Sequence, residues 1–271
     1  MSQTRSGDAL AMGPALAVQR DAIRRRLACA SASHDHGRAV NAPRYSLVIP
    51  FNNEAGNATP LLAAVRMILE AHTPDFEVVL VDDGSTDATP DELRNACAAE
   101  PRFRLMSLPR NIGQAGALLA GLQAARGAII LTMDGDGQND PRDFPILLAL
   151  VENDRADLAG GWRQDRHDPW SQRFLSRLAN AVRRFVFRDG MHDAGCQLRV
   201  FRREVIAALT PGPLLQAFLP TMVARAGFRV SEVPVRHHAR VFGRPHYGLR
   251  KLWWRPFCEM VVLWWRCRSR R

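Results

Sequence analysis

The feature that most constrains the fold of this chain is a regular alternation of short apolar runs with amphipathic segments, which begins at Tyr45. Residues 45–49, 76–81, 103–107 and 128–133 are rich in apolar side chains and predict strands that are buried in a sheet. The segments between them carry apolar residues at helical spacing. Strands that alternate with helices in this way predict a doubly wound α/β domain with a mostly parallel sheet.

Recognisable start signals precede the predicted helices. Thr59 is the expected N-cap of the first helix, with Pro60 at its first position. Thr89 and Pro90 are expected to open the second helix, and residues 116–125 are expected to form the third. These helices supply the crossover connections that parallel strands require.

Two aspartates directly follow the fourth predicted strand. Asp134 and Asp136 flank a single glycine and precede Gln138, and Asp140 with Pro141 predicts the start of the next helix. The motif therefore lies at the carboxyl end of a strand, where open α/β sheets bind ligands. The two carboxylates suit a hard divalent cation, with the Gln138 carbonyl as a third oxygen ligand. Taken alone, the motif is equally compatible with a solvated acidic turn.

Acidic residues also follow the first two predicted strands. Glu54 comes after the first strand, and Asp82 and Asp83 come after the second. Acidic groups on one rim of a sheet repel one another unless a cation or hydrogen-bond donors lie between them. The chain lacks both a Gly-x-Gly-x-x-Gly fingerprint and a P-loop, which disfavours a dehydrogenase or a P-loop phosphotransferase. The rim therefore predicts a site for a cation together with a base and a ribose.

The net charge of +10 is concentrated at the two ends of the chain. Residues 1–44 carry +4 and residues 236–271 carry +9, so the remainder is slightly acidic at −3. A basic nucleic-acid-binding protein is the main hypothesis from another functional class. The acidic rim and the lack of a basic domain argue against it, so we expect no nucleic-acid partner.

The first 44 residues are rich in Ala and Arg and predict a flexible N-terminal arm. The segment from Met1 to Leu16 lacks the continuous apolar run of a secretory signal. The five cysteines form no Cys-x-x-Cys pair. A reducing, cytosolic setting is therefore expected.

The ordered motifs resemble the family 2 glycosyltransferases with the GT-A fold. The resemblance is carried by five stretches, namely Leu47 to Glu54, Val81 to Asp87, Asn111 to Gly113, Ala120 to Gly127 and Asp134 to Gln138. It implies a GT-A (Rossmann-like) glycosyltransferase domain over residues 45–248. It also implies inverting transfer of a sugar from a nucleotide-diphosphate sugar.

The second half of the chain resembles the dolichol-phosphate mannosyltransferase branch of this family, which glycosylates a polyprenyl phosphate. This narrower resemblance is carried by Gly161 to Arg163, by Ser176 and Asn180, by Asp193 to Phe201 and by Arg240 to Tyr247. It implies a polyprenyl phosphate of the dolichyl or undecaprenyl type as the acceptor.

Transferred by position, the resemblance assigns Asp134, Asp136 and Gln138 to a Mg²⁺ or Mn²⁺ ion that binds the donor diphosphate. Such an ion stabilises the leaving diphosphate as a Lewis acid. The residues implied to line the nucleotide pocket follow the same strand ends: Pro50, Glu54, Asp82, Asp83 and Asp134.

The same transfer assigns Arg163, Ser176 and Arg240 to the acceptor phosphate, with Arg173 as a further candidate. A phosphate monoester carries a charge of about −1.5 to −2 at neutral pH and can attack without a general base. The planar guanidinium of arginine can donate two parallel hydrogen bonds to two phosphate oxygens. The residues expected to be catalytic are Asp134, Asp136, Arg163 and Arg240.

A hydroxyl acceptor is the alternative, because Asp193 offers a general base for deprotonating a sugar or lipid hydroxyl. The chain also departs from the family pattern. Asn52 stands where an aromatic residue is common, and Pro245 and His246 stand where Ser-Lys is usual. His246 is charged only when protonated, so acceptor binding is expected to depend on pH near neutrality.

Residues 249–271 form a basic tail that contains two tryptophan pairs spaced eleven residues apart. Eleven residues are about three helical turns, so both pairs share one face of a predicted amphipathic helix. Tryptophan with arginine is typical of a membrane interface, and the apolar run is shorter than the roughly 20 residues that span a bilayer. We expect a peripheral protein on the inner, cytoplasmic face of the membrane without a transmembrane segment. Whether a separate membrane protein completes the enzyme is left open by the sequence.

Overall fold

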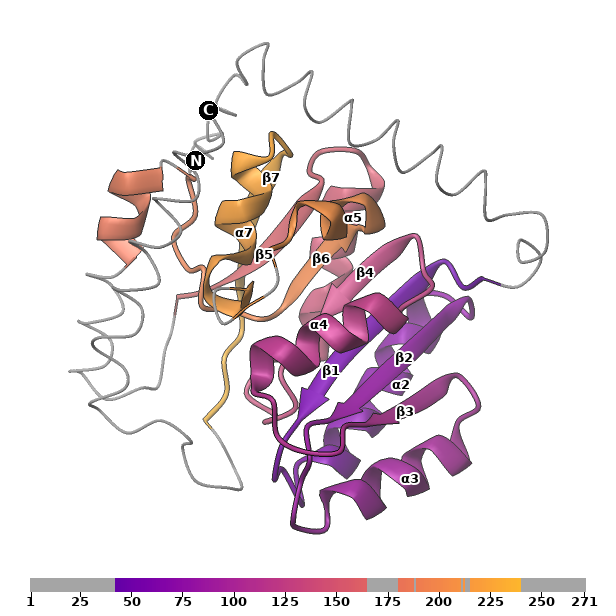
Figure 1. Cartoon of the computed structure of the whole chain (residues 1–271). Coiled ribbons are helices and arrows are strands. Elements are labelled where there is room, and N and C mark those ends of the chain that lie inside the picture. Colours follow the sequence, from indigo (N-terminus) through magenta and orange to yellow (C-terminus); the bar gives the residue numbers. More distant parts are fainter. Residues whose placement is uncertain (1–41, 165–179, 188, 211, 213–214, 240–271) are drawn as a thin grey trace, which may run out of the picture.

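The computed structural model describes residues 42–164, 180–187, 189–210, 212 and 215–239. These residues form a sheet of seven strands in the order β3-β2-β1-β4-β6-β5-β7, with helices on both faces (Figure 1). The predicted N-terminal arm of residues 1–44 is described only from residue 42, and the tail of residues 249–271 lies outside the described part. Within that part, no helix is long and apolar enough to cross a membrane.

The sheet is mostly parallel, as the sequence predicts. β6 is antiparallel to both of its neighbours, β4 and β5, and the other adjacent strands are parallel. The strands are β1 (Tyr45–Phe51), β2 (Phe76–Asp82), β3 (Phe103–Ser107), β4 (Ile129–Thr132), β5 (Leu158–Arg163), β6 (Arg199–Arg202) and β7 (Val230–Val235). β3 has the predicted bounds, whereas β1, β2 and β4 differ from prediction by one or two residues at their ends.

The helices lie in two layers. Helices α2 (Ala58–His72), α3 (Thr89–Ala99) and α5 (Phe144–Glu152) cover one face, and α4 (Gln114–Ala124) and α7 (Leu215–Arg225) cover the other (Figure 1). The 3₁₀ helices η1 (Pro141–Asp143) and η2 (Arg203–Ala208) connect other elements, and residues 180–187 are also helical.

The core is divided by the sheet into two apolar clusters. Leu47 and Ile49 of β1 pack toward α2 and α5, whereas Val48, the residue between them, packs toward α4 with Leu122. Each such Val or Leu side chain contributes roughly 1.5–3 kcal/mol when it is removed from water. Burial on both faces explains why these strands have apolar runs without an alternating polar pattern.

The start of α2 differs from the prediction. The helix begins at Ala58 with Asn57 as its N-cap, so Thr59 is not the cap, and Asn57 makes no side-chain capping bond. Instead, the Glu92 carboxylate of α3 accepts from the Gly56 amide at 2.7 Å and from the Thr59 amide at 3.2 Å. A neighbouring helix therefore satisfies the exposed amides that an N-cap usually satisfies.

Three other helix starts lie near the site. Asp140 caps η1 as predicted, because its carboxylate accepts from the Arg142 amide at 3.0 Å and Pro141 follows it. α3 begins at Thr89 with Ala88 as its N-cap, one residue earlier than a helix capped by Thr89 with Pro90 at its first position. α4 begins at Gln114, two residues before the predicted start at Gly116, with Gly113 as the residue before it.

Candidate active site

The three acidic groups share the edge at which β1, β2 and β4 end (Figure 1). β1 is paired in parallel with both β2 and β4, and Phe51 at its end lies opposite Asp82. Glu54, Asp82 and Asp83 are buried, whereas Asp134 and Asp136 are partly exposed. The topology thus brings together the residues that the sequence places after separate strands.

Asp83 anchors the loop that leads into α4. Its two carboxylate oxygens accept from the Ile112 amide at 2.7 Å and from the Gly113 amide at 2.9 Å. The Asn52 side chain donates to the Asp83 carbonyl at 2.8 Å. Asn52, which replaces the aromatic residue common in the family, therefore reinforces the rim through a backbone contact.

Asp82 and Glu54 have local partners as well. The Asp82 carboxylate accepts from the Ser85 amide at 3.0 Å, and the Glu54 carboxylate accepts from Asn57 at 2.8 Å. Gly84, between Asp83 and Ser85, has φ +64°, and a Cβ there would lie 2.6 Å from the Asn111 amide nitrogen. Only glycine allows this tight turn and the close approach of the loop.

Gly135 holds the two candidate metal ligands against β1. A Cβ on Gly135 would lie 2.5 Å from the Phe51 ring and 2.9 Å from the Pro50 carbonyl oxygen. A larger residue would therefore push Asp134 and Asp136 away from the strand end. Pro50 contributes to the floor of the site through this backbone contact.

Asp134 lies in an electrostatically unfavourable place for a lone carboxylate. Burial raises its pKa to about 7, and the neighbouring Asp136 adds to the increase. The charges of Arg199 and Arg163 and a hydrogen bond from Gln114 act in the opposite direction. A divalent cation would relieve the repulsion between the two aspartates.

The donor set fits Mg²⁺ or Mn²⁺ bound with a diphosphate. Asp134 and Asp136 offer carboxylate oxygens, and such cations often use one or two carboxylates with substrate phosphates as the other ligands. Among the described residues, no group of three His, Cys, Asp or Glu side chains gathers as a complete cage. Within the described part of the chain, amide oxygens are the other protein groups that could complete the coordination, together with water or the substrate.

Gln138 connects the aspartate motif to the segment after β7. Its amide donates to the Asp136 carboxylate at 3.1 Å, and its main-chain carbonyl accepts from the His238 amide at 2.9 Å. The Gln138 side chain also donates to the His238 carbonyl at 3.5 Å. A cation contact by Gln138 would therefore use its side-chain oxygen.

Arg163 and Asp193 form a bidentate ion pair at the end of the sheet. Arg163 Nε donates to one Asp193 oxygen at 2.7 Å and Nη2 donates to the other at 3.0 Å. The side chains are 15% and 5% exposed, so this pair is shielded from water. Because both oxygens of Asp193 are engaged, the geometry argues against its role as a general base. A phosphate contact by Arg163 would use guanidinium N–H groups other than these two or replace this pairing.

The other residues predicted for the acceptor are Arg173, Ser176 and Arg240, and they lie outside the described residues, as do Pro245 and His246. Of the four predicted acceptor residues, the structure describes Arg163.

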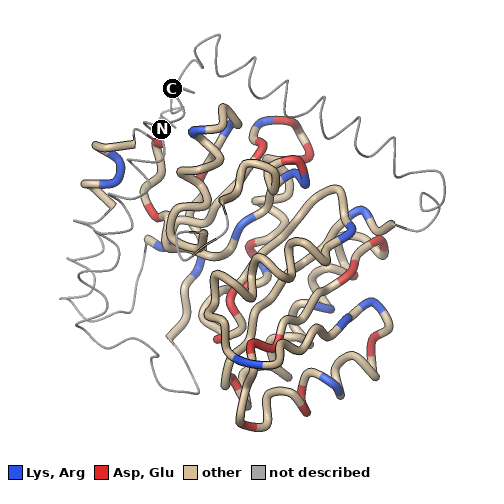
Figure 2. The backbone as a smooth tube through the Cα atoms, viewed as in Figure 1, with Lys and Arg blue, Asp and Glu red and all other residues tan. Residues whose placement is uncertain are grey.

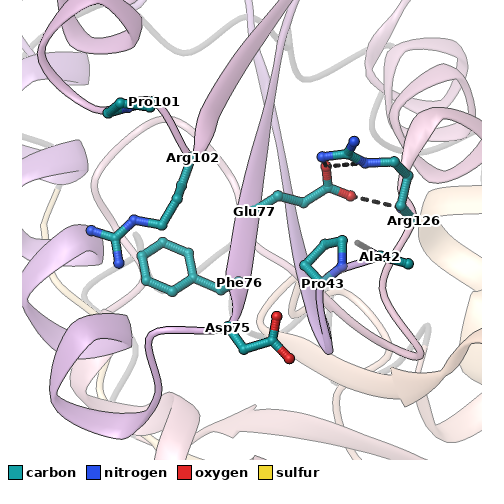
Figure 3. A pocket seen from close by; sticks show the side chains of 8 residues that line it. All are labelled: Ala42, Pro43, Asp75, Phe76, Glu77, Pro101, Arg102 and Arg126. Atoms are coloured by element: carbon teal, nitrogen blue, oxygen red, sulfur yellow. Dashed lines mark hydrogen bonds and ion pairs between the residues drawn. The ribbon is translucent and has the colours of Figure 1, made fainter. Parts of the chain in front are cut away.

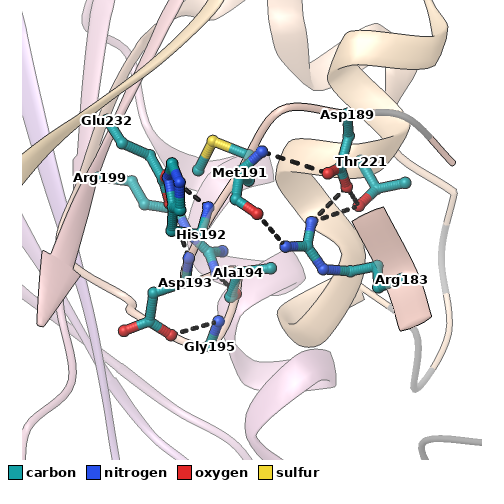
Figure 4. A network of polar contacts seen from close by, with 10 residues as sticks. All are labelled: Arg183, Asp189, Met191, His192, Asp193, Ala194, Gly195, Arg199, Thr221 and Glu232. Atoms are coloured by element: carbon teal, nitrogen blue, oxygen red, sulfur yellow. Dashed lines mark hydrogen bonds and ion pairs between the residues drawn. The ribbon is translucent and has the colours of Figure 1, made fainter. Parts of the chain in front are cut away.

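A network of buried polar groups holds that loop (Figure 4). Arg183 pairs with Asp189, donates to the Met191 carbonyl at 2.5 Å and contacts Thr221 of α7. Glu232 of β7 accepts from the Asp193 amide at 2.8 Å. Asp193 is thus held directly by Arg163 of β5 and Glu232 of β7, and the residues before it are held by Arg183 and Thr221.

Two residues at the site have no role in the sequence-based prediction. Arg199 of β6 is 1% exposed and donates to the carbonyls of Ala194 at 2.7 Å and Gln216 at 3.0 Å. Gln114 donates from its side chain to the Asp134 carboxylate. An arginine within an apolar strand is a signal that marks Arg199, whereas no local pattern marks Gln114.

A separate pocket of about 410 Å³ lies at the opposite, amino end of β2 (Figure 3). Its lining includes Glu77 and Arg126, whose side chains are already paired with each other. Hydrogen bonds from Ser46 and Arg126 hold the pKa of Glu77 below its usual value, although burial alone would raise it. This pocket is built from a satisfied structural network.

Acidic and basic residues are interspersed along the described backbone, as Figure 2 shows. A continuous basic face would be the expected footprint of a nucleic-acid-binding domain. The distribution agrees with the slightly acidic body predicted from the sequence.

Comparisons with solved structures agree with the GT-A fold. Glucosyl-3-phosphoglycerate synthase of Mycobacterium tuberculosis, in complex with Mn²⁺, UDP-glucose and phosphoglyceric acid, matches with a TM-score of 0.64 at 20% identity. The match covers 83% of this chain and 80% of that one. The mannosyltransferase PcManGT of Pyrobaculum calidifontis, in complex with GDP-Man and Mn²⁺, matches with a TM-score of 0.58 at 20% identity, over 95% of this chain and 74% of that one.

Sequence comparisons identify closer relatives. Dodecaprenyl-phosphate galacturonate synthase of Rhizobium johnstonii is 37% identical over 216 residues, which are 78% of this chain. Undecaprenyl-phosphate 4-deoxy-4-formamido-L-arabinose transferase of Edwardsiella ictaluri is 37% identical over 209 residues, which are 76% of this chain. In both cases the match spans 64% of the relative's own length. The family described as Glycosyl transferase family 2 matches residues 46–210, and the chain therefore belongs to the family 2 glycosyltransferases.

Proposed function

We propose that this protein transfers a sugar from a nucleotide-diphosphate sugar to a polyprenyl phosphate, with inversion at the sugar. The observation that carries the proposal is the pair Asp134 and Asp136 at the carboxyl end of β4, on the same sheet edge as Arg163 of β5. The relatives at 37% identity, named for dodecaprenyl and undecaprenyl phosphates, support this acceptor class.

Asp134 and Asp136 would hold Mg²⁺ or Mn²⁺ on the donor diphosphate, with Gln138 as a further ligand. An ion bound there would supply Lewis-acid stabilisation of the leaving diphosphate. The solved neighbours that contain Mn²⁺ together with UDP-glucose or GDP-Man support this assignment. Pro50, Glu54, Asp82 and Asp83 would border the nucleotide, either directly or by holding the rim.

The acceptor phosphate would bind near Arg163, with Arg173, Ser176 and Arg240 completing its contacts. Its own oxygen would attack the sugar, because a phosphate monoester is already ionised at neutral pH. The engagement of Asp193 by Arg163 favours this reaction over attack by a hydroxyl group that needs a base. Asp193 would act by orienting Arg163.

The reaction would take place at the cytoplasmic surface of the membrane, where a lipid phosphate is accessible to a peripheral protein. Residues 249–271 are proposed to lie in the membrane interface. Flotation with liposomes tests this part: the full chain should float, and a variant without residues 249–271 should float less. Equal flotation of both forms would refute the role of the tail.

The central experiment is a transfer assay with the purified full chain, Mn²⁺ and a panel of UDP- and GDP-sugars. Undecaprenyl phosphate and undecaprenol are compared as acceptors. We expect one donor to be used and the product to form only with the phosphate. Product formation on undecaprenol would favour the hydroxyl-acceptor reaction, whereas salt-sensitive DNA retention without nucleotide-sugar binding would favour the nucleic-acid hypothesis.

A further inference from the structure

Gln114 makes a direct contact with a candidate metal ligand. It is the first residue of α4, and its side-chain nitrogen donates to Oδ1 of Asp134, which lies 20 residues further along the chain. Asp134 and Asp136 repel each other, so the orientation of the Asp134 carboxylate depends on the groups that donate to it. Gln114 is such a group.

The position of Gln114 is set by a rigid connection. The Asp83 carboxylate accepts from the amides of Ile112 and Gly113, and Gly113 has φ +87°, a conformation that favours glycine. The Gly113 carbonyl then accepts from the Ala117 amide at 3.0 Å in the first turn of α4. The loop that ends at Gln114 is therefore pinned on both sides.

Helix α4 is itself firmly packed. Ala117, Leu118 and Leu122 are buried against the sheet in a cluster that contains Val48 and Val81. The packed helix fixes the backbone of Gln114, so only its side-chain torsions are ordered when it donates to Asp134. The contact links the Asp83 side of the rim to the metal motif through fixed backbone.

We propose that Gln114 is a positioning residue that orients Asp134 as a ligand for the divalent cation of the donor complex. The inference rests on the proposed function, because it assumes that Asp134 binds the cation. Gln114 holds one carboxylate oxygen and thereby fixes the plane in which Asp134 meets the ion. Partners of this kind are typically responsible for roughly 10–100-fold in metal affinity.

The test removes the hydrogen-bond donor of Gln114 but keeps the side-chain volume. Gln114→Met has nearly the length of glutamine and has no N–H group. Gln123→Met, at an exposed position of the same helix, is the matched control. Mn²⁺ binding to the full chain in the presence of UDP or GDP is measured by electron paramagnetic resonance, together with the thermal unfolding midpoint and with kcat and KM.

We expect Gln114→Met to weaken Mn²⁺ binding by about tenfold or more, and to lower kcat more than it changes the KM for the acceptor. Gln123→Met should bind Mn²⁺ as the wild type does. Unchanged Mn²⁺ affinity in folded Gln114→Met would overturn the inference while leaving the proposed function intact.

If Gln114→Met does not fold, Gln114→Asn keeps an N–H donor without adding a charge beside Asp134 and is measured in its place. An Mn²⁺ affinity at least tenfold higher than that of Gln114→Ala would support the requirement for a hydrogen-bond donor at this position. Equal binding by the two variants would count against it. A wild-type protein that binds no Mn²⁺ with either nucleotide would overturn the proposed function together with this inference.

Discussion

The part of the sheet proposed to bind the donor (β1, β2 and β4, here the donor half) and the part proposed to bind the acceptor (β5 and β6, here the acceptor half) are built in different ways. In the donor half, β1, β2 and β4 are parallel neighbours, and their acidic residues follow the strands directly. In the acceptor half, β6 runs antiparallel between β4 and β5, and Arg163 meets Asp193 across 30 residues of sequence. The position of the acidic residues follows from the strands that precede them in the sequence. The position of Arg163 and Asp193 follows from an ion pair between residues that are distant in the sequence.

This contrast predicts different consequences of mutation. Asp134 and Asp136 are partly exposed and repel each other, so the loss of either should affect chemistry more than folding. Asp193 and Arg163 are buried partners that hold a loop, so their loss should affect folding as well as chemistry. The following predictions test the contrast, from the largest expected effect to the smallest.

Asp134→Ala or Asp136→Ala should reduce sugar transfer to background, because each removes a proposed ligand of the cation. The thermal unfolding midpoint should not fall, since removal of either carboxylate relieves the repulsion between them. Transfer assays and differential scanning calorimetry measure the two effects. Near-wild-type turnover that still depends on metal would contradict the assignment.

Asp193→Ala should lower the free energy of unfolding by about 3 kcal/mol, because it leaves the shielded Arg163 guanidinium without its partner. In a matched set, the double variant Arg163→Met/Asp193→Leu should be less destabilised than Arg163→Met or Asp193→Leu alone. Urea unfolding of these three variants and the wild type completes a double-mutant cycle. If Asp193→Ala keeps full stability but loses turnover, Asp193 would act as a general base, contrary to the structural role expected here.

Glu92→Ala should lower the free energy of unfolding by about 1 kcal/mol, because it removes the acceptor that caps α2. Asp91→Ala, one residue earlier in the same exposed turn of α3, is the control. Transfer activity should be unchanged in both. An equal effect of the two variants on urea unfolding would show that the cap at Glu92 is energetically unimportant.

Acid should lower the free energy of unfolding by protonating Glu100, which lies at the opposite end of the sheet from the site. A hydrogen bond from Arg102 lowers the pKa of Glu100 to about 2. Since the unfolded value is about 4.3, the stability from Glu100 is present above that pH and is lost as the pH falls toward 2. Glu100→Gln should make the thermal unfolding midpoint depend less on pH over this range. An unchanged pH dependence would argue against the pairing of Glu100 with Arg102.

The sequence by itself determined the strand and helix alternation, the mostly parallel sheet and the rim of acidic residues. These follow from periodic burial and from the rule that parallel strands end on one side. The cap at Asp140 was predictable for the same reason, because its donor lies two residues away.

Only the tertiary structure decided which distant groups meet. Glu92 caps a helix that lies more than 30 residues earlier, and Gln114 reaches Asp134 from the start of another helix. Asp193, a possible base when read in the sequence, is engaged by Arg163 because β6 reverses direction beside β5. Such contacts have no local pattern, since a buried polar group is satisfied by whichever partner the packing brings near it.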